Sequence, residues 1–169
     1  MLEKLKFNKI KEKGFTLIEA FVAISVLTIG VVGSFGVLPT MIKNQAINTD
    51  AFLASQIANE GLELVRNLRD KNWLLEQDWK TGLAVICSSG CEIDYNDASL
   101  TASQNRFLKL DSNNFYNYES GQNSKFKRKV IIQEITVQGV AGVLNVKVEV
   151  FWNGKGSPFA AEGNFYDWR

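Results

Sequence analysis

The chain contains 169 residues, of which 46% are hydrophobic and 22% are charged, so it is long enough for one core of ordinary size but not for two. It contains no histidine, which excludes Ser-His-Asp and Cys-His catalysis and any zinc site that relies on imidazole. Its 19 basic and 18 acidic side chains give a formal charge of +1, so the total charge favours neither nucleic acid nor acidic lipid as a partner.

The N-terminus combines a basic segment with a long uncharged one. Residues 1–14 contain five lysines and two glutamates, and residues 20–42 contain no formal charge. About 20 apolar residues suffice to cross a bilayer as a helix, and this run is too long for an ordinary secretory signal peptide. The basic flank predicts that the N-terminus lies in the cytoplasm and that the chain from about Lys43 onward lies outside.

Glu19 lies against the apolar run, five positions after Gly14. A carboxylate at membrane depth costs roughly 2.5 kcal/mol or more, so such a group usually marks a pairing inside a helix assembly. The alternative is that Glu19 lies at the level of the lipid headgroups, favoured by the helix N-terminus.

These residues carry a family resemblance. Lys13-Gly14-Phe15-Thr16-Leu17-Ile18-Glu19, followed by the uncharged run, resembles the N-terminus of a type IV prepilin. The resemblance implies that a prepilin peptidase cuts between Gly14 and Phe15 on the cytoplasmic side and methylates the new amino group of Phe15. It also implies that Glu19 acts in assembly. The 14-residue leader is longer than in many members of the family that begin the mature chain with phenylalanine.

One stretch of the apolar segment combines the poorest helix formers. Gly30, Gly33 and Gly36 recur every three residues, and Pro39 follows at the same interval. We expect a hinge here that loosens when subunits leave the lipid. The alternative is tight helix packing in the membrane, for which small residues are favoured. Pro39 lies somewhat later than the proline that often kinks the family helix.

Beyond the membrane segment, apolar residues recur at spacings of four and three, which is typical of an amphipathic helix. They are Ile47, Ala51, Ala54, Ala58, Leu62 and Val65. We therefore expect residues 15–42 to form the membrane and filament-core segment of a helix that continues through residues 43–72. The small side chains on the stripe should let a sheet lie close to its outer half.

Residues 73–125 are rich in Asn, Asp, Ser and Gly, which predicts loops with one short hairpin, residues 107–110 against 115–118. Cys87 and Cys91 lie outside the cell in the predicted topology, so a disulfide is favoured over a metal or redox site. So short a loop contributes only about 2 kcal/mol in the chain-entropy model. Many type IV pilins carry their disulfide nearer the C-terminus, so its role there is not transferred to this chain.

Residues 126–169 predict an antiparallel sheet. We expect a first strand from 126 to 138 and a second from Leu144 to Trp152, where strict alternation gives one buried face. Asn153-Gly154 signals a turn, after which residues 159–168 can return as an edge strand. The order of long helix, variable loops and antiparallel meander is that of the α+β pilin fold, with residues 43–169 as a globular head. Short segments, including residues 60–66 and the C-terminal Trp-Arg, are similar to minor pilins of the PilV-like group.

Three further groups of residues could carry chemistry. Lys125, Lys127, Arg128 and Lys129 could contact DNA phosphates, as in DNA-uptake pilins, but a charged strand start that blocks edge pairing is the favoured interpretation. Asp94, Asn96 and Asp97 lack the glycine and distal glutamate of an EF-hand calcium loop. Glu60, Glu63 and Glu76 are explained more simply by helix ion pairs, such as Arg66 with Asp70, than by acid catalysis. We expect no catalytic residues, no metal and no cofactor.

The resemblance implies a structural subunit, a minor pilin, of a type IV pilus-like filament that serves adhesion or motility. Its partners would be other pilin subunits, the prepilin peptidase, an inner-membrane assembly platform and, before assembly, lipid. It would be a single-pass inner-membrane protein with its N-terminus in the cytoplasm, and then part of a surface filament. The alternatives are a pseudopilin of a type II secretion or competence system, and a bitopic membrane protein with an extracytoplasmic ligand-binding domain.

Overall fold

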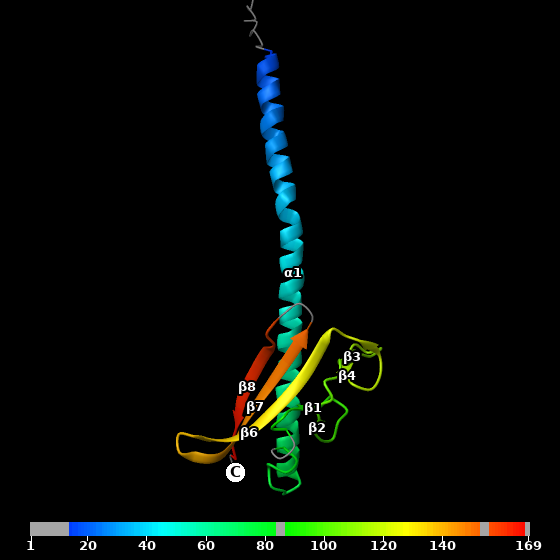
Figure 1. Ribbon diagram of the computed structural model, residues 1–169, viewed down its shortest axis with the longest axis vertical. Helices are drawn as coiled ribbons and strands as arrows, with labels where there is room; N and C mark the ends of the chain where they lie inside the picture. Colours follow the sequence, from blue (N-terminus) through cyan, green and yellow to red (C-terminus); the bar gives the residue numbers. More distant parts are fainter. Residues whose placement is uncertain (1–13, 84–86, 153–155, 168–169) are drawn as a thin grey trace, which may run out of the picture. The chain divides into compact units, whose positions relative to one another are not determined.

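The computed structural model describes residues 14–83, 87–152 and 156–167. Within these residues, one long helix, α1 (Leu17–Leu74), is followed by eight strands (Figure 1). The chain divides into two compact units, Met1–Ala46 and Ile47–Arg169. The architecture is α+β and pilin-like, with a long apolar N-terminal helix and an antiparallel sheet, and it confirms the predicted fold class.

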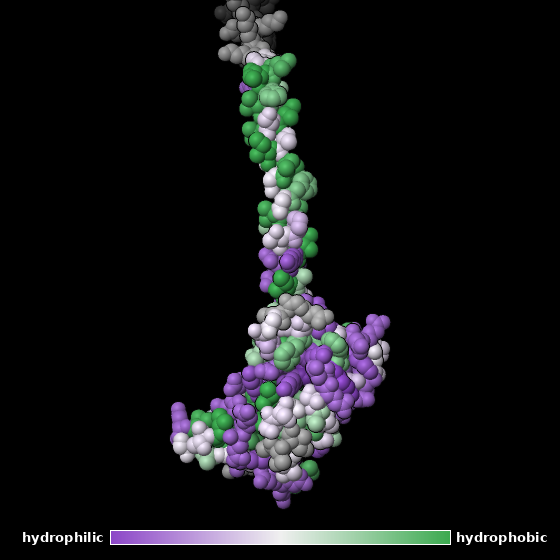
Figure 2. Space-filling view, viewed as in Figure 1, coloured by the Kyte–Doolittle hydropathy of each residue, from purple (hydrophilic) through white to green (hydrophobic). Residues whose placement is uncertain are grey.

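In the first unit, α1 carries an apolar surface, which Figure 2 shows as predominantly hydrophobic. Its few hydroxyl groups bond within the helix, because Ser25, Thr28 and Ser34 each donate to the carbonyl oxygen four residues earlier, at 2.7 to 2.8 Å. Such internal bonds let hydroxyl groups lie in an apolar environment without an unsatisfied donor. Among the described residues, α1 is the one helix that is long and apolar enough to cross a membrane, and none of its apolar window is buried.

In the second unit, α1 packs its small residues against a sheet. Ala54, Ala58 and Val65 of the predicted stripe are buried, whereas Ile47 is half exposed, so the packed face begins later than the periodicity indicated. At Gly61 an added Cβ would lie 2.9 Å from Cγ1 of Val148. This close approach confirms that small side chains on the helix bring the sheet near.

The main sheet has the strand order β2-β1-β6-β7-β8, and all of its pairs are antiparallel. Its three long strands are β6 (Phe126–Val137), β7 (Val140–Trp152) and β8 (Phe159–Phe165). Gln138 and Gly139 join β6 to β7 with positive φ angles of 50° and 84°, as a two-residue primed hairpin turn requires. The predicted strands are confirmed, with β8 at one edge; the predicted Asn153-Gly154 turn lies outside the described residues.

The segment predicted as loops contributes strands that the sequence did not reveal. β1 (Cys91–Glu92) and β2 (Thr101–Ala102) extend the main sheet beyond β6. A second small sheet consists of β3 (Lys109–Leu110), β4 (Tyr116–Asn117) and β5 (Gln122–Asn123), in the order β4-β3-β5. Its pairing of Lys109 with Asn117 and Leu110 with Tyr116 confirms the predicted hairpin. The sheet is therefore not confined to residues 126–169.

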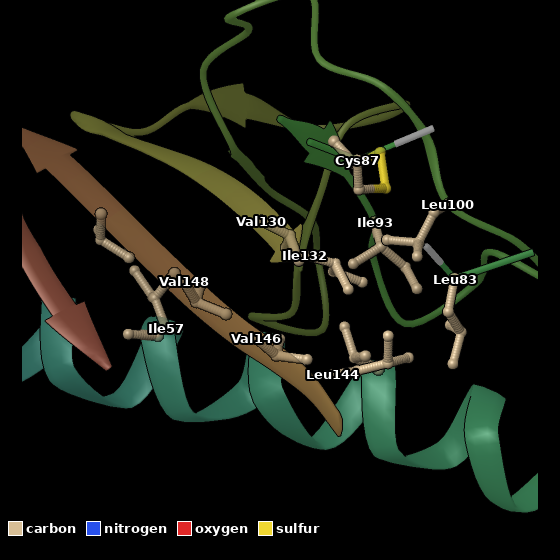
Figure 3. Packing of buried hydrophobic residues seen from close by; sticks show 14 of the residues in the cluster. Ile57, Leu83, Cys87, Ile93, Leu100, Val130, Ile132, Leu144, Val146 and Val148 are labelled. Atoms are coloured by element: carbon tan, nitrogen blue, oxygen red, sulfur yellow. A yellow bond between two sulfur atoms is a disulfide. The ribbon is translucent and has the colours of Figure 1, made fainter. Parts of the chain in front are cut away.

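The core lies between α1 and the inner face of the main sheet. The alternating residues of β7 point into it and lie beside helix residues such as Ile57 (Figure 3). Leu83, Ile93 and Leu100 close the core from the loop segment. The disulfide between Cys87 and Cys91 is buried there as well, and the carbonyl oxygen of Cys87 accepts a bond from the amide of Ile132 at 3.2 Å. Each of the two bonded cysteines therefore also contacts β6, because Cys87 accepts the bond from Ile132 and Cys91 pairs with Val130.

Candidate processing and assembly site

The start of α1 separates the predicted cleavage point from the helix. Gly14, Phe15 and Thr16 are exposed and non-helical, and the helix begins at Leu17. The amide of Glu19 donates to the hydroxyl oxygen of Thr16 at 3.3 Å, and the amide of Ala20 donates to the carbonyl of Thr16 at 3.1 Å. Thr16 therefore acts as the helix N-cap. The Gly14–Phe15 bond lies outside regular structure, as a protease substrate needs.

Glu19 lies in the first turn of α1, where the helix dipole favours a negative charge. Within the described part of the chain, no ion pair involves its carboxylate. The segment around it is lined by exposed apolar side chains: Phe15, Leu17, Ile18, Phe21, Val22 and Ile24 are 52 to 88% exposed. Glu19 is thus an acidic side chain surrounded by apolar side chains that no other part of the same unit covers.

The predicted hinge residues lie within helical backbone in this structure. Gly30, Gly33, Gly36 and Pro39 all belong to α1. A Cβ added at any of the three glycines would meet no atom within 4 Å, so nothing in one subunit requires them to be small. Their loosening during assembly stays a prediction.

Arg128 is a correction to the predicted basic cluster. Its side chain is fully buried, and its guanidinium donates to the backbone oxygens of Ile57 and Ile93 and pairs with Glu60 at 3.2 Å. It joins α1, β6 and the segment after β1, and it cannot contact DNA phosphates. The cause is strand alternation: Arg128 shares the inward face of β6 with Phe126 and Val130.

Lys127 and Lys129 lie on the face of β6 opposite to Arg128, and Lys125 directly precedes this strand. The three lysines differ in their partners. Lys125 pairs with Asp50, which lies on α1. The ammonium of Lys127 lies 4.4 Å from the ring centroid of Phe107. β6 pairs with β7 along its length and with β1 only at Val130, so protection of the edge at the start of β6 stays a prediction.

Glu92 is a buried ionic group that the sequence did not reveal. Its carboxylate accepts bonds from the hydroxyl of Ser103, the amides of Gln104 and Arg106, and the guanidinium of Arg106 at 2.8 Å. Burial alone would raise the pKa of Glu92, but these bonds outweigh it and hold that pKa below its ordinary value. Nothing in the sequence marks Glu92, because its partners come from a loop 11 to 14 residues later.

The other acidic residues serve the fold. The carboxylate of Asp94 accepts the amides of Asn96 and Tyr118, each at 2.9 Å, and the carboxylate of Asp97 accepts the amide of Asp94 at 2.8 Å. In the part of the chain that the structure describes, no group of three or more acidic or cysteine side chains could hold a metal ion.

The ion pairs of the helix differ from the predicted pairing of Arg66 with Asp70. Arg66 pairs with Glu63, three residues earlier, and Asp70 pairs with its neighbour Arg69 at 2.9 Å. The Arg66–Glu63 pair is exposed and of small energetic weight, and it accounts for Glu63 without a catalytic role.

Comparisons with known proteins bear on the N-terminus. No curated protein and no solved structure matches the chain. A protein-family model described as the prokaryotic N-terminal methylation motif matches residues 9–35, a span that contains Gly14, Phe15 and Glu19. This motif points to a structural pilin-type protein rather than an enzyme, and it indicates a type IV pilin-like or pseudopilin-type substrate of prepilin peptidase.

Proposed function

We propose that this chain is a minor pilin, of the PilV-like group, in a type IV pilus-like filament that is assembled from the inner membrane. The observation that carries the proposal is the methylation motif at residues 9–35, which opens a helix whose large apolar side chains are exposed from Phe15 to Ile42. Such a surface has to be covered by lipid or by other helices. The same segment therefore serves as the membrane anchor before assembly and as the filament core afterwards.

Processing prepares the subunit to move from the membrane into the filament. Cleavage between Gly14 and Phe15 removes five lysines and two glutamates, which leaves 14 basic and 16 acidic side chains in the mature chain. The charged leader, which holds the N-terminus in the cytoplasm, is lost, and the helix keeps one amino group at Phe15. That group stays positively charged after methylation.

Glu19 then sets the register of assembly. In a growing filament the carboxylate of an incoming subunit meets the Phe15 amino group of the subunit before it. This pairing offsets two desolvation penalties that would otherwise remain in an apolar core. Since only one axial offset closes the pair, Glu19 fixes register while the exposed apolar side chains supply most of the cohesion.

The mass of the mature chain tests the proposal. In a host with a prepilin peptidase, we expect the chain to begin at Phe15 and to carry a methyl group on that amine. Gly14→Leu should keep the leader and stay in the membrane, because the peptidase has to accept a residue without a side chain at the scissile bond; Gly14→Ala, a smaller change, should be cleaved better than Gly14→Leu. A wild-type chain that keeps its leader, or a Gly14→Leu chain trimmed at residue 15, contradicts the proposal.

A second measurement separates a pilus from its alternatives. Filaments sheared from the cell surface should contain the mature chain if it is a pilin. A processed chain that stays with the cell envelope and is required for secretion or DNA uptake instead indicates a pseudopilin. An unprocessed membrane chain is the result expected for a bitopic ligand-binding protein.

A further inference from the structure

A cleft of about 590 Å³ lies on the second unit, beside the first half of β6. We call it the lysine cleft, after Lys127 and Lys129, which line it. Both lysines lie on the face of β6 that points away from the core, because they alternate with the buried Phe126 and Arg128. Phe151 of β7 pairs with Lys127 across the strands and so lies on the same face. Figure 1 shows β6 and β7 side by side.

Four cationic residues line the lysine cleft, and two of them, Lys125 and Arg128, are ion-paired within the protein. Among the described residues, no ion pair involves Lys127 or Lys129. Glu149, which is the cross-strand partner of Lys129, pairs instead with Lys147 at 2.7 Å. The Cα atoms of residues two apart in a strand lie about 6 to 7 Å from each other, so Lys127 and Lys129 offer neighbouring cations to an anionic ligand.

The position of Lys129 depends on a glycine in the disulfide loop. Gly90 has a φ angle of +115°, and a Cβ added there would lie 2.0 Å from Cε of Lys129. The lysine side chain thus crosses the place where any other residue would put its side chain. Gly90, between the two bonded cysteines, thus leaves room for the side chain of Lys129.

Apolar rings and uncharged polar groups complete the lining. Phe107 and Phe151 are 37% and 39% exposed, so two aromatic rings face solvent beside the lysines. Ser89, Ser103 and Asn105 line the same cleft. Figure 2 shows hydrophilic side chains gathered over the sheet around scattered hydrophobic ones. Aromatic rings for stacking, hydroxyl and amide groups for hydrogen bonds, and a few charges are the usual composition of a site for a polar ring compound.

We propose that the lysine cleft binds a segment of an acidic polysaccharide. The C–H faces of the sugar rings pack on Phe151, the sugar hydroxyls bond to the serine and asparagine groups, and the carboxylates meet Lys129 and Lys127, whose ammonium lies over the ring of Phe107. The proposal does not depend on cleavage of the leader or on filament assembly, because every residue of the cleft belongs to the second unit.

The charge distribution favours this ligand over nucleic acid. Only two of the four clustered cations are available, because Arg128 is buried and Lys125 is paired with Asp50. The second unit, residues 47–169, carries 13 basic and 15 acidic side chains, so it has no net positive charge to attract a polyanion. Nucleic acid binding depends on neutralising many phosphates, whereas a glycan with spaced carboxylates needs only a few local charges.

The test measures binding of labelled probes to the full chain in a nonionic detergent. The probes are a galacturonate oligomer, its carboxyl-reduced neutral form, and a single-stranded oligonucleotide of similar length. We expect the wild-type chain to bind the galacturonate oligomer, to bind the neutral form at least about tenfold more weakly, and to lose affinity at high ionic strength.

Two variants distinguish the contribution of the lysine charges to binding from that of the aromatic ring. Lys127→Gln with Lys129→Gln should reduce galacturonate binding at least about tenfold, while Lys71→Gln with Lys109→Gln, an equal loss of charge outside the cleft, should leave it unchanged. Phe151→Leu keeps an apolar side chain and should weaken both sugar probes about threefold, because it removes the ring. Tryptophan fluorescence checks that each variant is folded.

Three results would overturn the proposal. They are the absence of galacturonate binding by the wild-type chain, an equal loss in the two double variants, and tighter binding of the oligonucleotide than of the galacturonate oligomer. The last result would assign the cleft to nucleic acid instead.

Discussion

Arg128 shows how strongly one residue can depend on its place in the fold. Its guanidinium is fully buried and pairs with Glu60, whose side chain is 37% exposed, and its Nε atom has no partner among the described residues. A buried cation stays favourable only while its partners compensate its lost hydration. Glu60 therefore carries more of the stability of the second unit than an ordinary helix glutamate does.

Glu60→Gln tests this dependence. We expect a loss of about 2 kcal/mol in the free energy of unfolding, less than the 3–5 kcal/mol typical of fully buried pairs because water reaches Glu60. Glu63→Gln, which removes a surface pair with Arg66, should cost at most about 0.5 kcal/mol. All four tryptophans lie beyond residue 72, so urea unfolding followed by tryptophan fluorescence reports on the second unit. Equal losses in the two variants would contradict the assigned role of Glu60.

Glu19→Gln tests the register model at the other end of the chain. It preserves shape and removes charge, so leader cleavage should be nearly intact while incorporation into filaments falls at least about tenfold. The measurement is the ratio of variant to wild-type chains in filaments from a cell that expresses both. Glu63→Gln, a charge loss outside the segment, should be incorporated normally. Incorporation of Glu19→Gln as efficient as wild type would end the pairing model for a subunit within the filament.

At the scale of elements, the first half of α1 combines a helix with residues that weaken it. Gly30, Gly33 and Gly36 have open space around them, so alanine fits at each position and raises the helix propensity by about 1 kcal/mol. We expect the triple alanine variant to be processed normally and to form filaments that extend less under force. Ser34→Ala is the control, because it changes the same stretch without replacing a glycine. Unchanged extensibility in single-filament pulling would show that these residues serve packing alone.

At the scale of the whole second unit, acid stability depends on Glu92. Because the pKa of Glu92 is lowered in the folded state, its contribution is complete above its unfolded pKa of about 4.3 and is lost as the pH falls through its folded pKa. Arg106, the charged group that faces it, stays protonated throughout, and its own pKa is raised chiefly by the bond to Glu92. Stability should therefore fall as the pH drops below about 4.3.

Glu92→Gln should remove this part of the pH dependence. At neutral pH we expect it to cost about 2 to 3 kcal/mol, since it removes the charge of a carboxylate that is 1% exposed and accepts several bonds. Once the pH is below the folded pKa of Glu92, the variant and the wild type should converge. Urea unfolding at a series of pH values measures both curves, and parallel curves over the whole range would assign the acid sensitivity to other carboxylates.

The sequence alone was sufficient to predict those features that depend on a local motif or on a periodic pattern of residues. The leader, Gly14, Phe15, Glu19 and the uncharged run form one continuous segment, and the matched methylation motif lies on it. The α+β order and the long strands followed from alternation, since one buried face of a sheet repeats every two residues. The primed turn at Gln138-Gly139 and the strands β1, β2 and β5 were missed, because two-residue strands have no period and depend on the neighbours that they pair with.

Tertiary structure decided which charged residues are buried and which are available. Arg128 and its neighbours Lys127 and Lys129 look alike as a run of cations, and the alternation that predicted the strand also separates their faces. Only the packing of α1 against β6 shows which face is inside and that Glu60 meets the arginine there. Glu92 with Arg106, and the lysine cleft with Phe107 and Phe151, likewise join segments far apart in the chain. Contacts of this kind follow from how helix and sheet pack in three dimensions, which no local pattern records.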